Sequence, residues 1–378
     1  MTTVWLIHVR DPQLNRQALL DDYQQFDAVK RLNKVGSWML DLNATVDTAL
    51  LLTQPGWGIE VVRESDGLPL ISGPMTTVDR KRANEENVIT VSGVDDVIHL
   101  ADRLVHPQPA SAVPPYGTTE HDVRTGTCST VLSAYVNVNA GPGALAPRRV
   151  TGLVLGADPV AGGSVTGRGR WQNLLVFLQE LALAGGGLAF DVRQLGTSLE
   201  FIVIQPEDKS ATVKFSLELG NLASYSYTLA APTSSYVVCG GGGEGTARTI
   251  REGQSSADIA EWRRRIEHFT DRRDTTDVTE LDQEIATTLA EAQAATTFSF
   301  VPIDLEGMAY LDDYDLGDRV AAVVDDTVTE LIREVKVSAT PDKSTITPSI
   351  GTPVLTDVAR LFRRLRSAEQ RVLNLERR

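Results

Sequence analysis

Residues 87–107, NVITVSGVDDVIHLADRLVHP, contain the change from strand to helix that decides the fold. Residues 88–92 are rich in β-branched side chains, which is typical of a strand. Apolar residues then recur at helical spacing, and these are Val94, Val97, Ile98, Ala101 and Leu104. Pro107 stops the helix. The pattern predicts a β-rich unit that is closed by a helix.

The same unit extends back to the first residue. Short apolar runs at 4–9, 38–42, 59–63 and 68–72 are separated by Gly, Asp and Asn, and they predict further strands. Downstream, residues 107–118 (PQPASAVPPYGT) are rich in proline and predict a linker. We therefore expect a first domain over residues 1–115.

Helical and strand patterns alternate in the next part of the chain. Residues 128–139 and 171–184 predict helices, and the glycine triplet 185–187 ends the second one. Strands are expected at 188–193 and 199–204, with a turn at Gly196, and further strands at 213–219 and 224–229. These features predict an inserted α/β domain over residues 116–225.

The following part, residues 226–352, begins with a helical segment. Apolar spacing predicts helix within 255–295, where Asp277 and Glu280 form a start of the capping-box kind. Strands return at 297–303, 319–324, 331–338 and 344–348. A second β domain is therefore expected here, and the fold class is α+β.

A faint internal repeat links the two β domains. The strand positions Trp38, Gly58, Ile71 and Ile89 correspond to Phe298, Gly317, Leu331 and Ile346, at offsets of 260, 259, 260 and 257 residues. Residue identity between the two parts is low, so chance β periodicity is an alternative to a true duplication. The spacing is the argument for duplication.

The last part of the chain, residues 353–378, predicts a coiled-coil helix. Its apolar residues alternate at spacings of four and three, which is the heptad pattern of self-associating helices, and these residues are Val354, Val358, Leu361, Leu365, Ala368, Val372 and Leu375. A single amphipathic helix that folds back on its own domain would show a similar pattern. The regular spacing favours self-association.

Composition excludes several classes of function. The 378 residues carry a net charge of −14, which argues against a nucleic-acid partner held by basic contacts. The two cysteines, Cys128 and Cys239, are too few for a disulfide framework or a zinc site, so two reduced, buried thiols are expected. The most apolar window, 174–184, is too short to span a bilayer, and we expect folding in a cytoplasm.

The motifs that resemble catalytic or binding sites have simpler interpretations. The run Gly240–Gly245 lacks the following helix of a dinucleotide site and predicts a loop. The cluster Asp312, Asp313, Asp315 and Asp318 departs from calcium-loop spacing and predicts a solvated turn, with weak cation binding left open. The arginines of 263–273 are interleaved with acids, which predicts a salt-bridged helix face or a subunit contact. No catalytic residue, metal ligand or cofactor is predicted.

Several blocks of the chain resemble a tail-protein family of long-tailed actinobacterial phages. They lie in order along nearly the whole chain, at 87–107, 135–148 (YVNVNAGPGALA followed by Pro147 and Arg148), 171–183, 228–248, 265–281 and 314–320 (YDLGDRV). None of these blocks is a catalytic motif, so they indicate a family and no reaction.

The resemblance implies a hub protein of the tail tip or baseplate, related to the hubs of contractile tails. Such hubs are trimers in which each chain has two β-barrel domains like those of the tail tube. The implied partners are a second and third copy of the chain, the tail tube or distal tail protein, the tape-measure protein and a central fibre or spike. The hub would also gate the DNA channel and hold it closed until infection. DNA would pass through the channel without specific binding, and no membrane binding is implied. The protein would be located in the virion after assembly in the host cytoplasm.

Two other functions remain open from the sequence. One is a tail-associated peptidase or hydrolase, which would need a cluster of His, Asp and Glu in a pocket. The other is a receptor-binding fibre or adhesin, which would need a ligand-binding face and would have no central channel.

Overall fold

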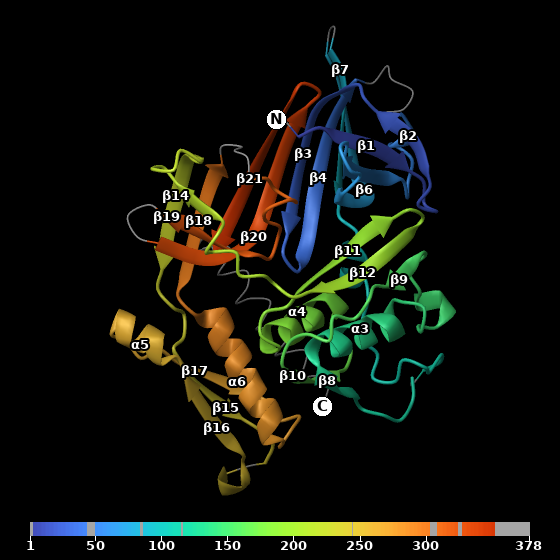
Figure 1. Cartoon of the computed structure of the whole chain (residues 1–378). Helices are drawn as coiled ribbons and strands as arrows, with labels where there is room; N and C mark the ends of the chain where they lie inside the picture. Colours follow the sequence, from blue (N-terminus) through green and yellow to red (C-terminus); the bar gives the residue numbers. More distant parts are fainter. Residues whose placement is uncertain are drawn as a thin grey trace.

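The computed structural model describes residues 3–43, 50–83, 86–114, 116–243, 245–302, 308–323 and 327–351. One large sheet forms the upper part of the molecule in Figure 1, and two smaller units lie below it. The heptad residues Val354, Val358, Leu361, Leu365, Ala368, Val372 and Leu375 lie outside the described residues.

The large sheet has thirteen strands. They are β1 (Trp5–Arg10), β2 (Arg16–Leu20), β3 (Tyr23–Arg31), β4 (Lys34–Asn43), β5 (Gly58–Arg63), β6 (Pro69–Ala83), β7 (Glu86–Val94), β13 (Lys214–Ser216), β14 (Leu222–Ala230), β18 (Ala295–Pro302), β19 (Arg319–Val323), β20 (Thr327–Thr340) and β21 (Lys343–Gly351).

The sheet consists of two halves with the same strand order. In the first half, β3, β4, β7, β6 and β5 lie side by side in that order, and β14, β18, β21, β20 and β19 do so in the second half. Every neighbouring pair within these two series is antiparallel. The duplication indicated by the sequence is thus confirmed as a repeat of topology.

The repeat extends to the register of the strands. Trp38 pairs with Gly93 in the first half, and Phe298 pairs with Ile350 in the second, so the register recurs 260 residues later in one strand and 257 in the other. The bulge between Met75 and Thr77 recurs between Ile332 and Glu334. Two of the sequence-based matches agree with these offsets of 260 and 257 residues, namely Trp38 with Phe298 and Ile89 with Ile346.

The other two matches were wrong by a few residues. Val61 pairs with Ile71, and Ala322 pairs with Val328, so the structural offsets are 261 for β5 and 257 for β6. Gly58 therefore corresponds to Arg319, and Ile71 to Val328. The error arose because the connection between β5 and β6 differs in length from that between β19 and β20.

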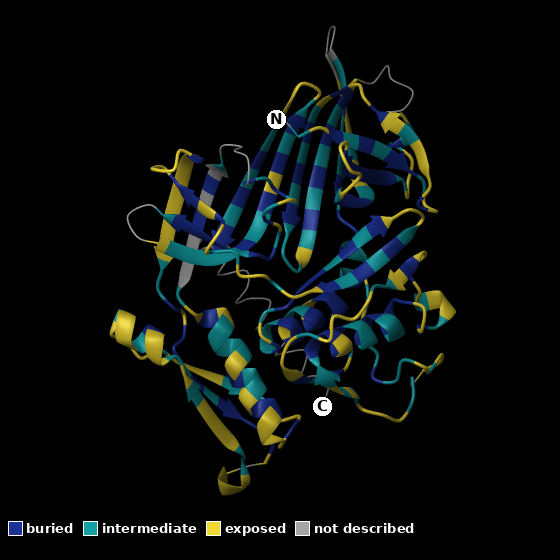
Figure 2. Ribbon diagram, viewed as in Figure 1, coloured by how far each residue is buried: buried dark blue, intermediate teal, exposed yellow. Residues whose placement is uncertain are grey.

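The two halves join at the centre of the sheet, where β20 pairs with β3 over residues 334–339 and 26–31. One apolar core runs beneath both halves and includes Phe26, Trp38, Phe298 and Val337. Burial alternates along the central strands, so that one face of the sheet is buried and the other is partly exposed (Figure 2). Among the described residues no pairing closes either half into a barrel, so the sheet is open.

The inserted unit lies between β7 and β13 and packs beneath the first half. It contains α2 (Ile98–Ala101), β8 (Asp122–Thr127), α3 (Cys128–Asn139), η1 (Ala146–Arg148), β9 (Leu153–Leu155), β10 (Ser164–Gly169), α4 (Leu174–Ala184), β11 (Ala189–Leu195) and β12 (Ser198–Ile204). Its own apolar core is built around α3 and α4. The expected helix over 94–104 is only the four residues of α2. The helix over 128–139 is confirmed, and the one expected over 171–184 begins at Leu174.

Buried charges fix the inserted unit to the sheet. The Arg10 guanidinium donates to both carboxylate oxygens of Asp96 at 2.6 and 2.8 Å and to Gln194 Oε1 at 2.6 Å. Ser72 Oγ also donates to Asp96, at 2.6 Å. All four side chains are buried, and they come from β1, the segment after β7, β11 and β6. A second ion pair joins Lys30 of β3 to Asp191 of β11 at 2.5 Å.

The second small unit is inserted between β14 and β18. It contains β15 (Tyr236–Gly240), η2 (Gly245–Ala247), β16 (Ile250–Gln254), α5 (Ser256–Trp262), β17 (Glu267–Asp271) and α6 (Val278–Ala292). Asp277 caps α6 by accepting a hydrogen bond from Thr279 N at 2.8 Å, as its sequence predicted. The expected helical segment is interrupted by β17, which pairs in parallel with β15. The domain boundary expected at residue 225 falls inside β14.

Candidate functional site: the polar face of the sheet and its open edges

The partly exposed face of the sheet is rich in hydroxyl groups. Cross-strand partners share a face. The side chains between the buried positions of β3, β4, β7, β20 and β21, together with the residues of β6 that share this side, form the surface that we call the polar face. Its small polar members are Ser37, Thr90, Ser92, Ser338, Thr345, Thr347 and Ser349. The face crosses from the first half to the second without a break because β3 and β20 are paired.

Acidic and basic side chains on the polar face nearly balance in number. The acidic members are Asp27, Asp41, Asp79 and Glu334, and the basic members are Arg31, Lys81 and Lys336. Several of them pair with one another or with hydroxyl groups. The face is therefore nearly neutral, although the whole chain carries a charge of −14.

The hydrogen bonds of this face cross the joint between the halves. Arg31 Nε lies 2.9 Å from Glu334 Oε2, and Ser338 Oγ donates to Asp27 Oδ1 at 2.7 Å. Within the first half, Thr90 Oγ1 donates to Asp41 at 2.6 Å. These bonds fix the conformations of the side chains, so the polar face is preorganised.

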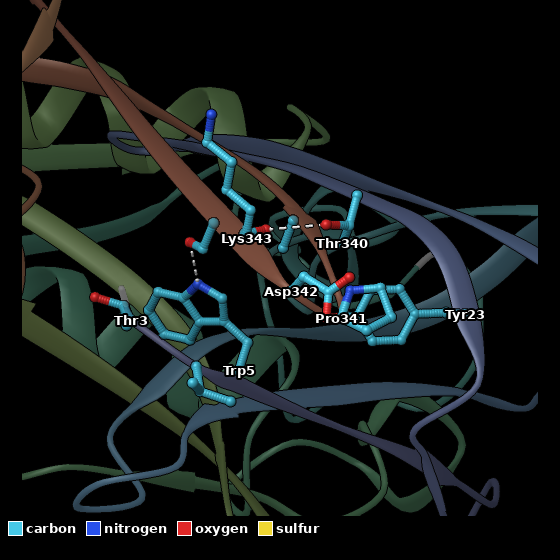
Figure 3. Close-up of a pocket in the computed structure, with 10 residues that line it drawn as sticks. Thr3, Trp5, Tyr23, Thr340, Pro341, Asp342 and Lys343 are labelled. Carbon is cyan, nitrogen blue, oxygen red and sulfur yellow. Dashed lines mark hydrogen bonds between the residues drawn. The ribbon is translucent and has the colours of Figure 1, made fainter. Parts of the chain in front are cut away.

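Two hollows lie near the joint. A shallow depression on the polar face is lined by Asp27, Val29, Ser37, Trp38, Met39, Ser92, Gly93 and Lys336. A smaller cavity of about 50 Å³ lies where the N-terminal strand meets the β20–β21 hairpin (Figure 3). There Trp5 Nε1 donates to Ser344 Oγ at 3.1 Å. This second cavity is much smaller than the roughly 300–1,000 Å³ clefts that hold small-molecule ligands.

The strand β14 is an edge of the sheet. It pairs with β18 on one side, and on its other side it has no partner among the described residues. Its residues 223–229 are exposed, including Tyr225 at 40%, Tyr227 at 49% and Leu229 at 47%. Tyr225 stacks on the buried Phe298 with ring centroids 5.3 Å apart. The apolar face of the core thus continues to the edge and is left uncovered there.

The glycine run has the loop role that the sequence indicated. It is followed by the short η2 turn and by β16 instead of a long helix. A Cβ on Gly241 would lie 2.8 Å from the carbonyl oxygen of Thr275, and one on Gly240 would meet the Arg248 guanidinium at 2.6 Å. Close packing explains these glycines, and the dinucleotide interpretation has no structural support.

The aspartates of 312–318 are engaged with the protein itself. Asp312 accepts from Arg63 at 2.7 and 2.8 Å, and Asp318 lies 2.8 Å from Lys209 Nζ. Burial raises the pKa of Asp315. Within the described part of the chain, no group of three or more His, Cys, Asp or Glu is arranged to hold a metal ion.

The arginine-rich segment is salt-bridged, but it is not a helix as the sequence suggested. It begins after α5, which ends at Trp262, and forms a loop and β17. Arg272 pairs with Glu284 at 2.7 Å and with Asp274 at 3.0 Å, and Arg265 lies over the Tyr236 ring at 3.6 Å.

The two cysteines are free and buried, as expected. Burial raises the pKa of each thiol to about 11, so both stay protonated at neutral pH. In the described ranges no helix is long and apolar enough to cross a membrane.

Sequence reasoning missed one of the two strands that matter most for this site and the exposed edge of the other. The strand β3 was not predicted, although Phe26, Ala28 and Lys30 alternate with half-buried positions along YQQFDAVKR. The strand β14 was predicted at 224–229, but its exposure was not. The alternation of Tyr225, Tyr227 and Leu229 with Ser and Thr indicates a strand, but it does not show that one side of this strand lacks a partner.

The fold is that of phage tail proteins, as three solved structures show. The prophage MuSo2 43 kDa tail protein from Shewanella oneidensis is 12% identical, with a TM-score of 0.61, and the match covers 92% of this chain and 98% of that one. The tail protein from Neisseria meningitidis is 13% identical, with a TM-score of 0.55 and coverage of 92% and 96%. The prophage tail protein gp18 from Listeria monocytogenes is 11% identical, with a TM-score of 0.54 and coverage of 96% and 99%.

The chain belongs to the siphovirus ReqiPepy6 Gp37-like protein family, whose model matches residues 6–352. It is therefore a phage tail protein and part of the virion. No curated protein matches the sequence.

Proposed function

We propose that three copies of this chain form a ring, the hub at the tip of the tail. The ring would join the tail tube or distal tail protein to a central fibre or spike, and the tape-measure protein and the DNA would lie along its axis. The role is structural and includes no catalytic step. The observation that carries this proposal is the repeat of one five-strand unit within each chain, in the same register in both copies.

The repeat supports a trimer because it supplies two similar units per chain. Three chains then contribute six units, and six units can match a tail tube of sixfold symmetry. In such a ring every unit contacts the next one through the same pair of surfaces, as in other closed rings built from head-to-tail contacts. In this proposal the two halves of the sheet are the two tube-like domains, whose barrel form is completed only in the ring.

The polar face is the proposed wall of the channel. Clusters of Lys and Arg bind DNA because they neutralise its phosphates and release the counterions condensed on it. The polar face instead offers hydroxyl groups and basic side chains that are matched by acids, such as Arg31 with Glu334. DNA would therefore pass without being held.

The heptad residues of 353–378 are proposed to form a three-stranded coil below the ring. Three heptads are marginal for an isolated coiled coil, but they become stable when an oligomeric body brings the helices together. The domains proposed from the sequence are then 1–115, 116–225, 226–352 and this helix.

Light scattering of the full-length protein and of a truncation that ends at Thr352 tests this function. We expect a mass of three chains for the full-length protein. The truncated protein should form a weaker trimer, which is already dissociated at concentrations where the full-length trimer is intact. If the chain forms a trimer only together with its neighbouring proteins, the isolated protein stays monomeric. The number of copies per tail tip is therefore also counted in isolated tails. A tail tip without three copies of the chain would overturn the proposal.

A further inference from the structure

The joint between the two halves shows how one unit binds the next. In this joint, β3, the first strand of the first unit, pairs antiparallel with residues 334–339 of β20 in the second unit. Phe26 lies opposite Ala339, and Ala28 lies opposite Val337. These four side chains are on the core face and are at most 2% exposed.

The segments that correspond to this joint in the opposite halves each have a strand partner on one side only, among the described residues. The equivalent of β3 is β14, because Ala28 pairs with Trp38 as Tyr227 pairs with Phe298. The equivalent of residues 334–339 is 77–82 of β6, because Thr77 pairs with Ser92 as Glu334 pairs with Ser349. Outside this sheet pairing with β18 and β7, neither segment has a strand partner in the described ranges.

The edge of β14 lacks the usual protection of exposed strands. Natural edge strands carry charges, proline or a covering element that prevents pairing with another chain. Residues 223–230, ASYSYTLA, contain no charged residue and no proline, and Tyr225, Tyr227 and Leu229 project on the core face. An exposed edge of this composition is suited to a partner strand.

We propose that β14 of one copy pairs antiparallel with β6 of the next copy, in the register of the joint between β3 and β20. This proposal rests on the proposed ring and specifies its contact surface. The equivalence of positions places Val78 opposite Leu229 of the next copy, Asp79 opposite Thr228, and Arg80 opposite Tyr227. These three pairs are obtained by replacing each residue of an observed pair by its equivalent in the other half. The observed pairs are Val335–Lys30, Lys336–Val29 and Val337–Ala28.

The side chains at these positions suit one another. Val78 is already packed against the core, and Leu229 would extend that core across the boundary. The Arg80 guanidinium would lie beside the Tyr227 ring, where a cation is attracted to the ring face. The pairing would also cover the exposed apolar row of β14 and extend the sheet from one chain into the next.

Cysteine crosslinking tests the register. The pair Asp79→Cys with Thr228→Cys places both thiols on the polar face of adjacent strands, and the native Cys128 and Cys239 are buried and do not compete. The matched control is Asp79→Cys with Ser224→Cys, which moves one thiol about 13 Å along the same strand on the same face. Both variants are oxidised as purified protein and in isolated tails.

We expect the matched pair to give a ladder of linked chains that ends at three, with at least about fivefold more product than the shifted pair, because disulfides form only over short Cβ distances. Tails that contain three copies but give equal crosslinking in both variants, or none, would overturn the strand pairing and leave the ring intact. Tails that lack three copies would overturn both.

A second variant tests the same edge without crosslinking. Tyr227→Lys sets a positive charge opposite Arg80, and Leu229→Lys sets a second one opposite the apolar Val78. We expect association to weaken by about a hundredfold, because like charges across an interface repel and a charge buried against an apolar side chain is costly. Val154→Lys with Val176→Lys is the control, since these side chains are similarly exposed, at 40% and 41%. Unchanged assembly of the β14 variant, measured by its incorporation into tails, would count against the pairing.

Discussion

Two neighbouring aspartates have opposite electrostatics because their surroundings differ. Asp96 is paired with the Arg10 guanidinium, which holds its pKa well below its ordinary value despite full burial. Asp95 is also buried, and burial raises its pKa to about 7, while the nearby Lys30 only partly offsets this. Lys30 itself pairs with Asp191. A single residue step thus separates a carboxylate that stabilises the fold from one that titrates near neutral pH.

The replacement Asp95→Asn should change how stability depends on pH. The pKa of Asp95 in the folded state lies above its value in the unfolded chain, so its stabilising contribution is complete below about pH 4 and is lost as the pH rises through 7. Ionisation of Asp95 should therefore cost the wild type about 2–4 kcal/mol of unfolding free energy between these limits, and the asparagine variant should lack this part of the pH dependence. Urea unfolding at pH 5, 6, 7 and 8 measures the difference.

Asp96→Asn is the matched control for that experiment. Removing one partner of a buried ion pair leaves Arg10 without its counter-charge, which costs about 3–5 kcal/mol. The loss should be present at every pH of the series, because the lowered pKa keeps Asp96 ionised throughout. If Asp95→Asn is no more stable than the wild type at pH 8, the assigned protonation of Asp95 is wrong.

At the scale of elements, the second unit carries an insertion that the first lacks. The strands β3 and β4 are joined by a two-residue turn, Leu32 and Asn33, and Asn33 has a positive φ of 55°. Their equivalents β14 and β18 are separated by the small unit of β15, β16, β17, α5 and α6. Since Ala230 pairs with Ala295, the two ends of the insertion lie side by side.

We expect the sheet to fold without this insertion. Replacing residues 231–294 by Asn-Gly should give a two-residue hairpin between Ala230 and Ala295, because Asn-Gly favours the turn that matches strand twist. The small unit has its own core, with Val237, Cys239, Leu281 and Ile285, so its removal leaves the core of the sheet unchanged. A cooperative thermal transition and retained β-sheet circular dichroism are expected; a molten chain would show that the insertion is required for folding.

The elements also show how far the sequence leads. The strands around Trp38 and Ile89 and their equivalents were predictable because apolar residues alternate there and the spacing recurs. The β3 strand was missed because Lys30 stands at a buried position of its apolar pattern, where it forms an ion pair with Asp191. The β17 strand was taken for helix because Phe269 follows Ile266 at three residues, whereas its pairing with β15 is a tertiary contact that no local pattern carries.

For the candidate site, the sequence supplied the repeat but not the open edges. Whether a strand has one neighbour or two depends on the whole sheet, so the exposure of Tyr225 and Tyr227 could not be read from alternation alone. The heptads of 353–378 remain a prediction.

At the scale of the whole molecule, the charge of the polar face should control passage of DNA. Ser37→Lys, Ser92→Lys and Ser338→Lys together would add unmatched positive charges to the proposed channel wall. We expect slower DNA ejection and measurable DNA binding by isolated tail tips, with a salt dependence that steepens by about 0.9 in log–log slope for each phosphate contact.

The glutamine variants at the same three positions are the control for that experiment, because they add bulk without charge. Lysine variants that eject DNA at the rate of the glutamine variants would show that the polar face does not line the channel.

The joint between β3 and β20 has a further consequence for the kinetics of assembly. Because both units belong to one chain, every second unit–unit contact of the proposed ring is made within a folded monomer, where the effective concentration of the partner strand far exceeds that of free protein. Only the remaining contacts require a bimolecular encounter. A virus that makes a few rings per particle can then complete them from a dilute pool of subunits, at concentrations where six separate units would still be dissociated.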